Sequence, residues 1–197
     1  MARRRATGIK KPPPGRLRIV AGNWRSRLLD IAAAPGLRPT PERVRETLFN
    51  WLAPRIEGAR CLDLYAGTGA LGLEALSRGA ATTVFVEKSA LAAGVLKSNI
   101  EELGAEGATI CEADAIEYLR KIPVKSFDIV FLDPPFAADI LEDLCRLIDE
   151  RQVLADGARV YLEHSVAKIE PELPGGWEVL KSEVAGQVRY SLVAPGA

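Results

Sequence analysis

Acidic residues stand where successive strand-like runs of the sequence end. They are Asp63, Glu87, Asp114 and Asp133. The carboxyl ends of parallel strands meet at one edge of a sheet, and such sheets bind their ligands there. A single acid at this position could cap the following helix, but four in succession predict a site that presents negative charge to its ligand.

Residues 63–72 read D-L-Y-A-G-T-G-A-L-G and contain a glycine-rich loop. Gly67, Gly69 and Gly72 satisfy G-x-G-x-x-G, a spacing that permits a tight turn and close approach of the backbone to a ligand. Glu87 follows Gly67 by 20 residues, where an acid can hold ribose hydroxyls. Both a dinucleotide and an S-adenosyl ligand fit this spacing.

Asp63, four residues before the first glycine of the loop, separates the two ligands. A pyrophosphate is negatively charged and is best bound by a helix N-terminus without a nearby carboxylate. S-adenosylmethionine carries an α-ammonium and a sulfonium, and a carboxylate attracts both. The loop therefore favours a cationic ligand.

Residues 133–136 read D-P-P-F. An exocyclic amine of a nucleobase is a poor nucleophile, because its lone pair is delocalised into the ring. Asp133 and the main-chain carbonyl of Pro134 can accept hydrogen bonds from such an amine and orient it for methyl transfer. Phe136 can stack on the base, which must leave its own stack to enter the site. A rigid turn without chemistry is the alternative interpretation of the motif.

From residue 59 onward, strand-like and helix-like patterns alternate. One helical pattern is opened by Ser89 and closed by Gly104. Two terminal strand-like runs joined through Ala185 and Gly186 predict an antiparallel hairpin. We expect an α/β fold with a doubly wound, Rossmann-like, mostly parallel sheet of seven strands. Near-continuous apolar runs, typical of strands covered on both faces, occupy residues 59–65, 82–87, 108–114, 127–133 and 158–164.

The charge is unevenly distributed although its net value is zero. Residues 1–60 hold 14 Lys and Arg against 4 Asp and Glu. The first 27 residues carry nine basic side chains and no acidic one, which favours binding to a phosphate backbone. We expect residues 1–15, with their triple proline, to be a disordered basic arm and residues 16–35 to form a basic β-hairpin before a domain at 36–197. A solvated tail without a partner is the alternative.

A helix is predicted to start near residue 40. Thr40 can cap its free N–H groups and Pro41 suits the first helical position. Arg43 falls on a face away from the apolar stripe, which is either a solvated face or one that borders a ligand cleft. Trp24 and Tyr65 could line a base pocket or belong to the core.

Several classes of site and location are disfavoured. Three cysteines without C-x-x-C spacing suit a reducing compartment. No apolar run approaches the roughly 18 residues that span a bilayer, and arginines interrupt the segment where a signal peptide needs its apolar core. No metal-ligand spacing occurs, and we expect the lone His164 to be structural or to face the surface. These features predict a cytoplasmic protein without membrane or metal.

Four stretches in chain order resemble the RsmD family, bacterial methyltransferases of guanine N2 in small-subunit (16S) ribosomal RNA. The resemblance covers about residues 16 to 193, and D-L-Y-A-G-T-G with D-P-P-F is typical of class I S-adenosylmethionine-dependent methyltransferases of amino groups. The stretches are R-I-V-A-G-N-W-R-S-R-L-L, G-L-R-P-T-P-E-R-V-R-E-T-L-F-N-W-L, L-D-L-Y-A-G-T-G-A-L-G-L-E-A-L-S-R-G-A and V-A-G-Q-V-R-Y.

The resemblance implies S-adenosylmethionine as cofactor and small-subunit ribosomal RNA as partner, either naked or within a ribosomal particle, bound by a monomer. Asp133, Pro134 and Phe136 would act on the acceptor base. The residues that would bind cofactor are Asp63, Gly67 and Gly69 at the methionine part, Glu87 at the ribose, Asp114 and Ala115 at the adenine, and also Tyr65. The candidates for contact with RNA are Arg16, Arg18, Trp24, Arg25, Arg27, Arg38 and Arg43.

Other functions remain open on the sequence alone. An amino methyltransferase acting on DNA adenine or cytosine, or on a protein amide, would use the same motif, because Asp133 and Pro134 can serve either purine. A dinucleotide-dependent oxidoreductase is disfavoured by Asp63 and by the lack of chain for a separate substrate domain. A non-catalytic RNA-binding module is disfavoured by the intact D-P-P-F.

Overall fold

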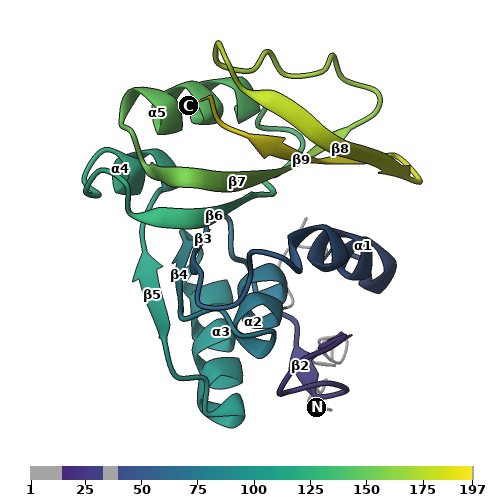
Figure 1. The fold of residues 1–197 in the computed structure, drawn as a ribbon. Coiled ribbons are helices and arrows are strands. Elements are labelled where there is room, and N and C mark those ends of the chain that lie inside the picture. Colours follow the sequence, from purple (N-terminus) through teal and green to yellow (C-terminus); the bar gives the residue numbers. More distant parts are fainter. Residues whose placement is uncertain (1–14, 33–39, 197) are drawn as a thin grey trace, which may run out of the picture.

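A computed structural model describes residues 15–32 and 40–196. Residues 1–14 of the expected arm at 1–15, residues 33–35 of the expected hairpin segment at 16–35, and the candidate Arg38 lie outside these ranges. Within them, the chain forms a seven-stranded sheet covered by helices on both faces, together with a separate two-stranded hairpin (Figure 1). The elements are β1 (Arg16–Arg18), β2 (Leu28–Asp30), α1 (Glu42–Leu52), β3 (Arg60–Asp63), α2 (Ala70–Ser77), β4 (Thr82–Glu87), α3 (Ala90–Leu103), β5 (Ala108–Glu112), α4 (Ala115–Leu119), β6 (Phe127–Leu132), α5 (Leu141–Glu150), β7 (Leu154–Ser165), β8 (Glu178–Ala185) and β9 (Val188–Ala194).

The sheet has the order β5-β4-β3-β6-β7-β9-β8. The first five strands in this order are parallel, while β9 pairs antiparallel with both β7 and β8. This arrangement confirms the predicted doubly wound sheet and its antiparallel terminal hairpin. All five parallel strands end at the same edge of the sheet. The order of strands reverses between β3 and β6, and ligands of such sheets bind at the carboxyl ends of the strands beside this point.

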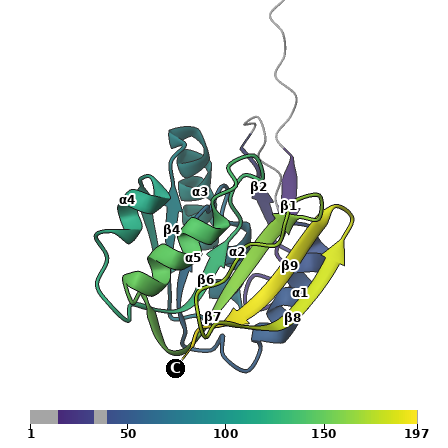
Figure 2. The same ribbon diagram turned by 90° about the horizontal axis from the view of Figure 1, so that it is seen from above.

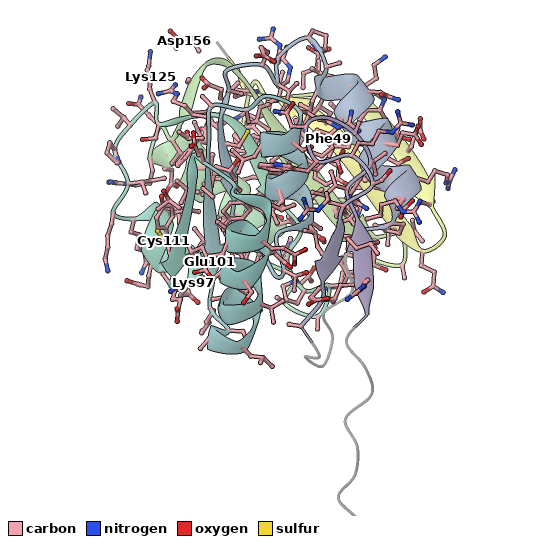
Figure 3. All side chains as sticks on the ribbon, turned by 90° about the horizontal axis from the view of Figure 1, so that it is seen from below. Phe49, Lys97, Glu101, Cys111, Lys125 and Asp156 are labelled. Atoms are coloured by element: carbon pink, nitrogen blue, oxygen red, sulfur yellow. The ribbon has the colours of Figure 1, made fainter. Side chains whose placement is uncertain are left out.

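Helices cover the two faces of the sheet unequally. Figure 1 shows α1, α2 and α3 on one side and α4 and α5 on the other. Phe49 points from α1 toward the sheet (Figure 3), and its ring centroid lies 5.9 Å from that of Phe131. At the antiparallel edge, α1 lies beside β9 (Figure 2), where Trp51 stacks on Tyr190 at 5.5 Å. The α1 helix therefore covers one face of the sheet beside β9.

Helix boundaries agree with the sequence for α3 but not for α1. Ser89 accepts a hydrogen bond from the Ala92 amide, and Gly104 ends α3 in the left-handed conformation at φ 60°. The prediction that Thr40 caps α1 is wrong. Pro41 occupies the cap position without a side-chain cap bond, and the Thr40 hydroxyl instead donates to Asp133.

The N-terminal hairpin is present as predicted and docks on α2 through its main chain. The amides of Val20 and Ala21 donate to the two oxygens of Glu74 at 2.8 and 3.0 Å. Gly22 has φ +83°, and a Cβ there would lie 1.8 Å from the carbonyl oxygen of Ser77. Only glycine fits this position, because the two backbones meet there.

Glu74 also forms a fully buried ion pair with Arg45 of α1. The Arg45 Nη1 donates to Glu74 at 3.0 Å, its Nη2 to the Arg18 carbonyl at 2.7 Å, and its Nε to the Thr40 carbonyl at 3.1 Å. Both side chains have no exposed surface. Burial lowers the pKa of Arg45, and the Glu74 carboxylate opposes that change. One ion pair thus joins the hairpin, α1 and α2.

We expect Glu74→Gln to lower the free energy of unfolding by about 3–5 kcal/mol, because the buried Arg45 guanidinium would lose its counter-charge. Urea denaturation of the full chain measures this change. Glu102→Gln is the matched control, since Glu102 pairs with Arg27 on the exposed surface and its loss should cost less than about 1 kcal/mol. Equal effects of the two substitutions would contradict the proposed importance of the buried pair.

Candidate active site

A cavity of about 1000 Å³ lies at the carboxyl ends of the parallel strands. Five carboxyl groups line it, and among its described lining residues Lys88 is the sole basic one. Such a charge balance favours a cationic or hydrogen-bond-donating ligand over a polyphosphate. The carboxyl groups are those of Asp63, Glu87, Asp114, Asp133 and Glu163.

The glycine loop forms the floor of one half of the cavity. Gly67 and Gly69 have φ values of 53° and 88°, which favour glycine, and a Cβ on Gly69 would lie 2.5 Å from Leu96. Glu87 accepts hydrogen bonds from the amides of Gly67 at 2.8 Å and Ser89 at 2.7 Å. The carboxylate predicted to hold a ribose thus also fixes the shape of the loop.

Asp63 lies at the end of β3 beneath the loop. Its Oδ2 accepts the Gly72 amide at 2.9 Å, and the side chain is almost entirely buried. Burial raises the pKa of Asp63 to about 7, the Gly72 hydrogen bond opposes this rise, and the Glu87 carboxylate adds to it. A cation placed beside Asp63 would favour its ionised form.

Asp114 and Ala115 lie at the start of α4, on the far wall of this half. Asp114 accepts hydrogen bonds from the amides of Ile116 and Glu117 and therefore does cap the helix. Its carboxylate also pairs with Lys88 at 3.2 Å, and that hydrogen bond is the main reason for its lowered pKa. Tyr65 lines the cavity and also packs against the hydrophobic core on the α4–α5 side.

The other half of the cavity contains two facing carboxyl groups. Asp133 and Glu163 directly follow Leu132 and Leu162, which are paired between β6 and β7. Thr40 donates to Asp133 Oδ2 at 3.3 Å, and the Tyr161 hydroxyl donates to Glu163 Oε1 at 2.7 Å. The Thr40 hydroxyl comes from the segment just before α1. The Tyr161 hydroxyl comes from the face of β7 that also carries Glu163.

Burial raises the pKa of both Asp133 and Glu163. The Glu163 carboxylate raises the pKa of Asp133 further, and the Thr40 hydroxyl lowers the pKa of each. Two adjacent buried carboxyls cannot both ionise cheaply, so the pair retains a proton to higher pH than an isolated carboxyl would. Perturbed acids in a cavity are typical of functional sites.

The D-P-P-F segment forms the rim of this half. Pro134, Pro135 and Phe136 line the cavity, and they also border a second cavity of about 420 Å³. Phe136 is 41% exposed, an unusual state for a large aromatic side chain. An exposed ring beside a buried acid pair suits a base-stacking role.

Within the described residues, the arginines predicted to bind RNA lie outside the cavity. Arg16 faces Asp30 at 3.3 Å, and Arg27 faces Glu102 at 3.4 Å. Arg18 lies 4.0 Å from Glu42, and these hairpin arginines are all exposed. In the described ranges, no ion pair involves Arg25 of the hairpin or the exposed Arg43 of α1. Trp24 does not line the cavity and packs against the core of the α1 side.

Comparison with known proteins assigns the chain to a family. A family model described as "Conserved hypothetical protein 95" matches residues 17–194. The chain belongs to this family. It is 44% identical over 187 residues to the Ribosomal RNA small subunit methyltransferase D of Escherichia coli K12, covering 93% of this chain and 94% of the relative. The relative of the same name from Haemophilus influenzae is 41% identical, covering 90% and 93%.

Solved structures agree with this assignment. The yhhF protein of Escherichia coli has a TM-score of 0.86 at 42% identity, covering 93% of this chain and 99% of its own. The HI0767 protein of Haemophilus influenzae has a TM-score of 0.80 at 38% identity, covering 93% and 100%. The resemblance to the RsmD family and the expected fold are confirmed.

Two further observations concern the classes that the sequence disfavoured. No helix within 15–32 and 40–196 is long and apolar enough to cross a membrane. No group of three or more His, Cys, Asp or Glu side chains in the same ranges is placed to hold a metal ion. His164 is buried in β7, where its Nδ1 lies 3.2 Å from the Ser165 carbonyl oxygen.

Two residues of the site were missed by the sequence analysis. Thr40 was interpreted as a helix cap, and Glu163 was passed over because the apolar run continues to His164. The same strand-end rule that found Asp133 would have found Glu163, since β6 and β7 are neighbours in register. The Thr40 contact had no local signal, because its partner is 93 residues away.

The carboxyl pair predicts a pH-dependent effect on stability. Because folding raises the pKa of Asp133, ionising it costs stability, and that cost appears as pH rises above the ordinary carboxyl value of about 4. Asp133→Asn should therefore stabilise the protein at pH 8 and less so at pH 5. A gain of about 1 kcal/mol would raise Tm by roughly 2–4 °C.

Scanning calorimetry at the two pH values checks this prediction. Asp156→Asn, an exposed acid at the opposite end of the strands, is the control and should change Tm little at either pH (Figure 3). A destabilised Asp133→Asn protein at pH 8 would show that the acid pair is not strained.

Proposed function

We propose that the protein transfers a methyl group from S-adenosylmethionine to the exocyclic N2 amine of a guanine in small-subunit ribosomal RNA. The observation that carries the proposal is a single cavity with the acid-lined glycine loop in one half and D-P-P-F in the other. Membership of a family with ribosomal RNA methyltransferases supports the substrate. A rival substrate such as DNA adenine is an outcome of the test below.

The cofactor half fits S-adenosylmethionine in charge. Asp63 faces the cationic methionine part, Glu87 the ribose, and Asp114 with Ala115 the adenine, while Gly67 allows close backbone approach. The predicted cofactor contact of Gly69 is not part of this proposal, because Gly69 is absent from the cavity lining and a Cβ there would meet Leu96. The acidic lining with Lys88 already paired supports a cationic ligand. When bound, S-adenosylmethionine supplies an electrophilic methyl group on a sulfonium.

The acceptor half orients the amine. Asp133 and the Pro134 carbonyl accept its two N–H groups, which directs the nitrogen lone pair toward the cofactor half. Asp133 then takes the proton that the methylated nitrogen loses, a task suited to its raised pKa. Phe136 stacks on the extruded base, a contact worth about 1–3 kcal/mol.

The basic hairpin and α1 hold the RNA outside the cavity. Arg25 and Arg43 engage phosphates first. Arg16, Arg18 and Arg27 add charge when RNA displaces their carboxylate partners. Arg38 remains a candidate from its charge alone. The enzyme acts in the cytoplasm as a monomer, on ribosomal RNA that is either naked or within a ribosomal particle.

Asp63→Asn should weaken S-adenosylmethionine binding about ten- to a hundredfold, because a charged hydrogen-bond acceptor is replaced by a neutral one. For the wild type, affinity should fall as pH drops through about 7, since binding needs Asp63 ionised. The variant should lose this pH dependence. Calorimetry from pH 6 to 8 measures both effects, and unchanged affinity and slope would remove Asp63 from the cofactor site.

The substrate is tested in cells that lack the gene. Mass spectrometry of their small-subunit ribosomal RNA should show the loss of one N2-methylguanosine, and wild-type protein should restore it. Asp133→Ala and Phe136→Ala should restore it poorly, with in vitro rates reduced about 10²–10⁴-fold for Asp133→Ala, while both variants keep cofactor affinity. A missing mark found in DNA or protein instead would favour the rival amino methyltransferases.

A further inference from the structure

Glu163 takes no part in orienting the amine through Asp133 and Pro134, although it lines the acceptor half and is 4% exposed. The alternation along β6 and β7 decides its direction. Leu132 and Leu162 pack into the core on the α4–α5 side, so the next residues of both strands face the α1 side. Asp133 and Glu163 therefore stand next to each other on one face, because they directly follow the paired residues Leu132 and Leu162 of neighbouring strands.

The two carboxyl groups have unused capacity to accept hydrogen bonds. Two hydroxyl donors, from Thr40 and Tyr161, serve four carboxyl oxygens. Within the described ranges, no Lys or Arg forms an ion pair with either acid. Each ionised carboxylate can accept several hydrogen bonds, so the pair suits a ligand that presents two adjacent donors.

Guanine is the nucleobase that presents such donors beside an exocyclic amine. Its Watson–Crick edge carries the N2 amine next to N1–H. In adenine and cytosine, the ring nitrogen next to the amine carries a lone pair, which a neighbouring carboxylate would repel. Asp133 and Pro134 alone would serve any of these amines, so the choice of base needs another group.

We infer that Glu163 selects guanine by accepting a hydrogen bond from its N1–H, beside Asp133, which accepts from the N2 amine. This specificity role rests on the proposed transfer to an exocyclic amine. Tyr161 positions Glu163, because its hydroxyl holds Oε1 at 2.7 Å and leaves Oε2 for the base. Guanine binding supplies donors to both acids and so stabilises their ionised forms.

The test compares guanine with 2-aminopurine, which keeps the amine at C2 but has an acceptor instead of N1–H. Small-subunit particles are reconstituted with either nucleoside at the position located by mass spectrometry. Wild-type enzyme should prefer guanosine about ten- to a hundredfold in kcat/KM, the discrimination of one good base contact. Equal rates on the two particles would overturn the inference.

Two variants test Glu163 itself. Glu163→Gln keeps an oxygen for Tyr161 and turns an N–H donor toward N1, so the preference should reverse toward 2-aminopurine. Glu163→Ala removes the acceptor without adding a donor, so the two rates should become nearly equal. Retention of the wild-type preference in either variant would overturn the inference.

Glu183→Gln is the matched control. Glu183 also accepts a tyrosine hydroxyl, that of Tyr190 at 2.8 Å, but it lies outside the cavity lining. Its substitution should leave the preference unchanged, and a changed preference would overturn the assignment of selectivity to direct contact with Glu163. If wild-type enzyme methylates neither nucleoside, in these particles or in the same RNA without ribosomal proteins, the proposed function fails, and the inference fails with it.

Discussion

The Glu74 carboxylate accepts hydrogen bonds from four donors that belong to three parts of the chain. Two are main-chain amides of the hairpin, one is Arg45 of α1, and one is Arg78 at the end of its own helix. Taking a carboxylate out of water is costly, and this arrangement offsets the cost by leaving no buried polar atom of the described side chains without a partner.

The position of the acceptor half depends on the ion pair between Glu74 and Arg45. Arg45 holds the Thr40 carbonyl, and the Thr40 hydroxyl in turn reaches Asp133. The part of the molecule that would grip RNA and the part that would hold its base are thereby fixed to a common frame. A shift of the hairpin cannot occur without disturbing the entry of α1.

The pair of Asp133 and Glu163 differs from Glu74, because its carboxyl groups are buried without a basic partner among the described residues. Asp133 and Glu163 have raised pKa values, and the described chain places no cation beside them. Such strain is expected where an active site is built for a ligand and not for the stability of the free protein. The cofactor half follows the same logic, since burial of Asp63 disfavours the charge that a cationic ligand would restore.

Sequence patterns predicted the sheet, α3 and four of the five acids that line the cavity, because those features depend on local periodicity and on a topological rule. Ser89 and Gly104 are residue types that commonly begin and end helices. Asp63 and Glu87 end parallel strands, whose carboxyl ends lie at one edge of the sheet. Contacts between distant segments had no such signal. Thr40 carries the signature of a helix cap. Arginine side chains are rarely buried in proteins, so nothing in the sequence indicates that Arg45 of α1 is buried. Only the packed structure reveals the partners of these two residues.

The main-chain docking of the hairpin has a consequence for how the protein can change. Its amides and carbonyls make the hydrogen bonds with Glu74, Arg45 and Ser77, and a side chain added at Gly22 would collide with the Ser77 carbonyl. Leu17, Ile19 and Leu29 of the hairpin are buried in the core and are not part of its outer surface. The outward side chains of the hairpin can therefore be exchanged with little effect on how it is mounted. A new RNA target could be acquired by substitutions on the outer surface of the hairpin while the cavity stays intact.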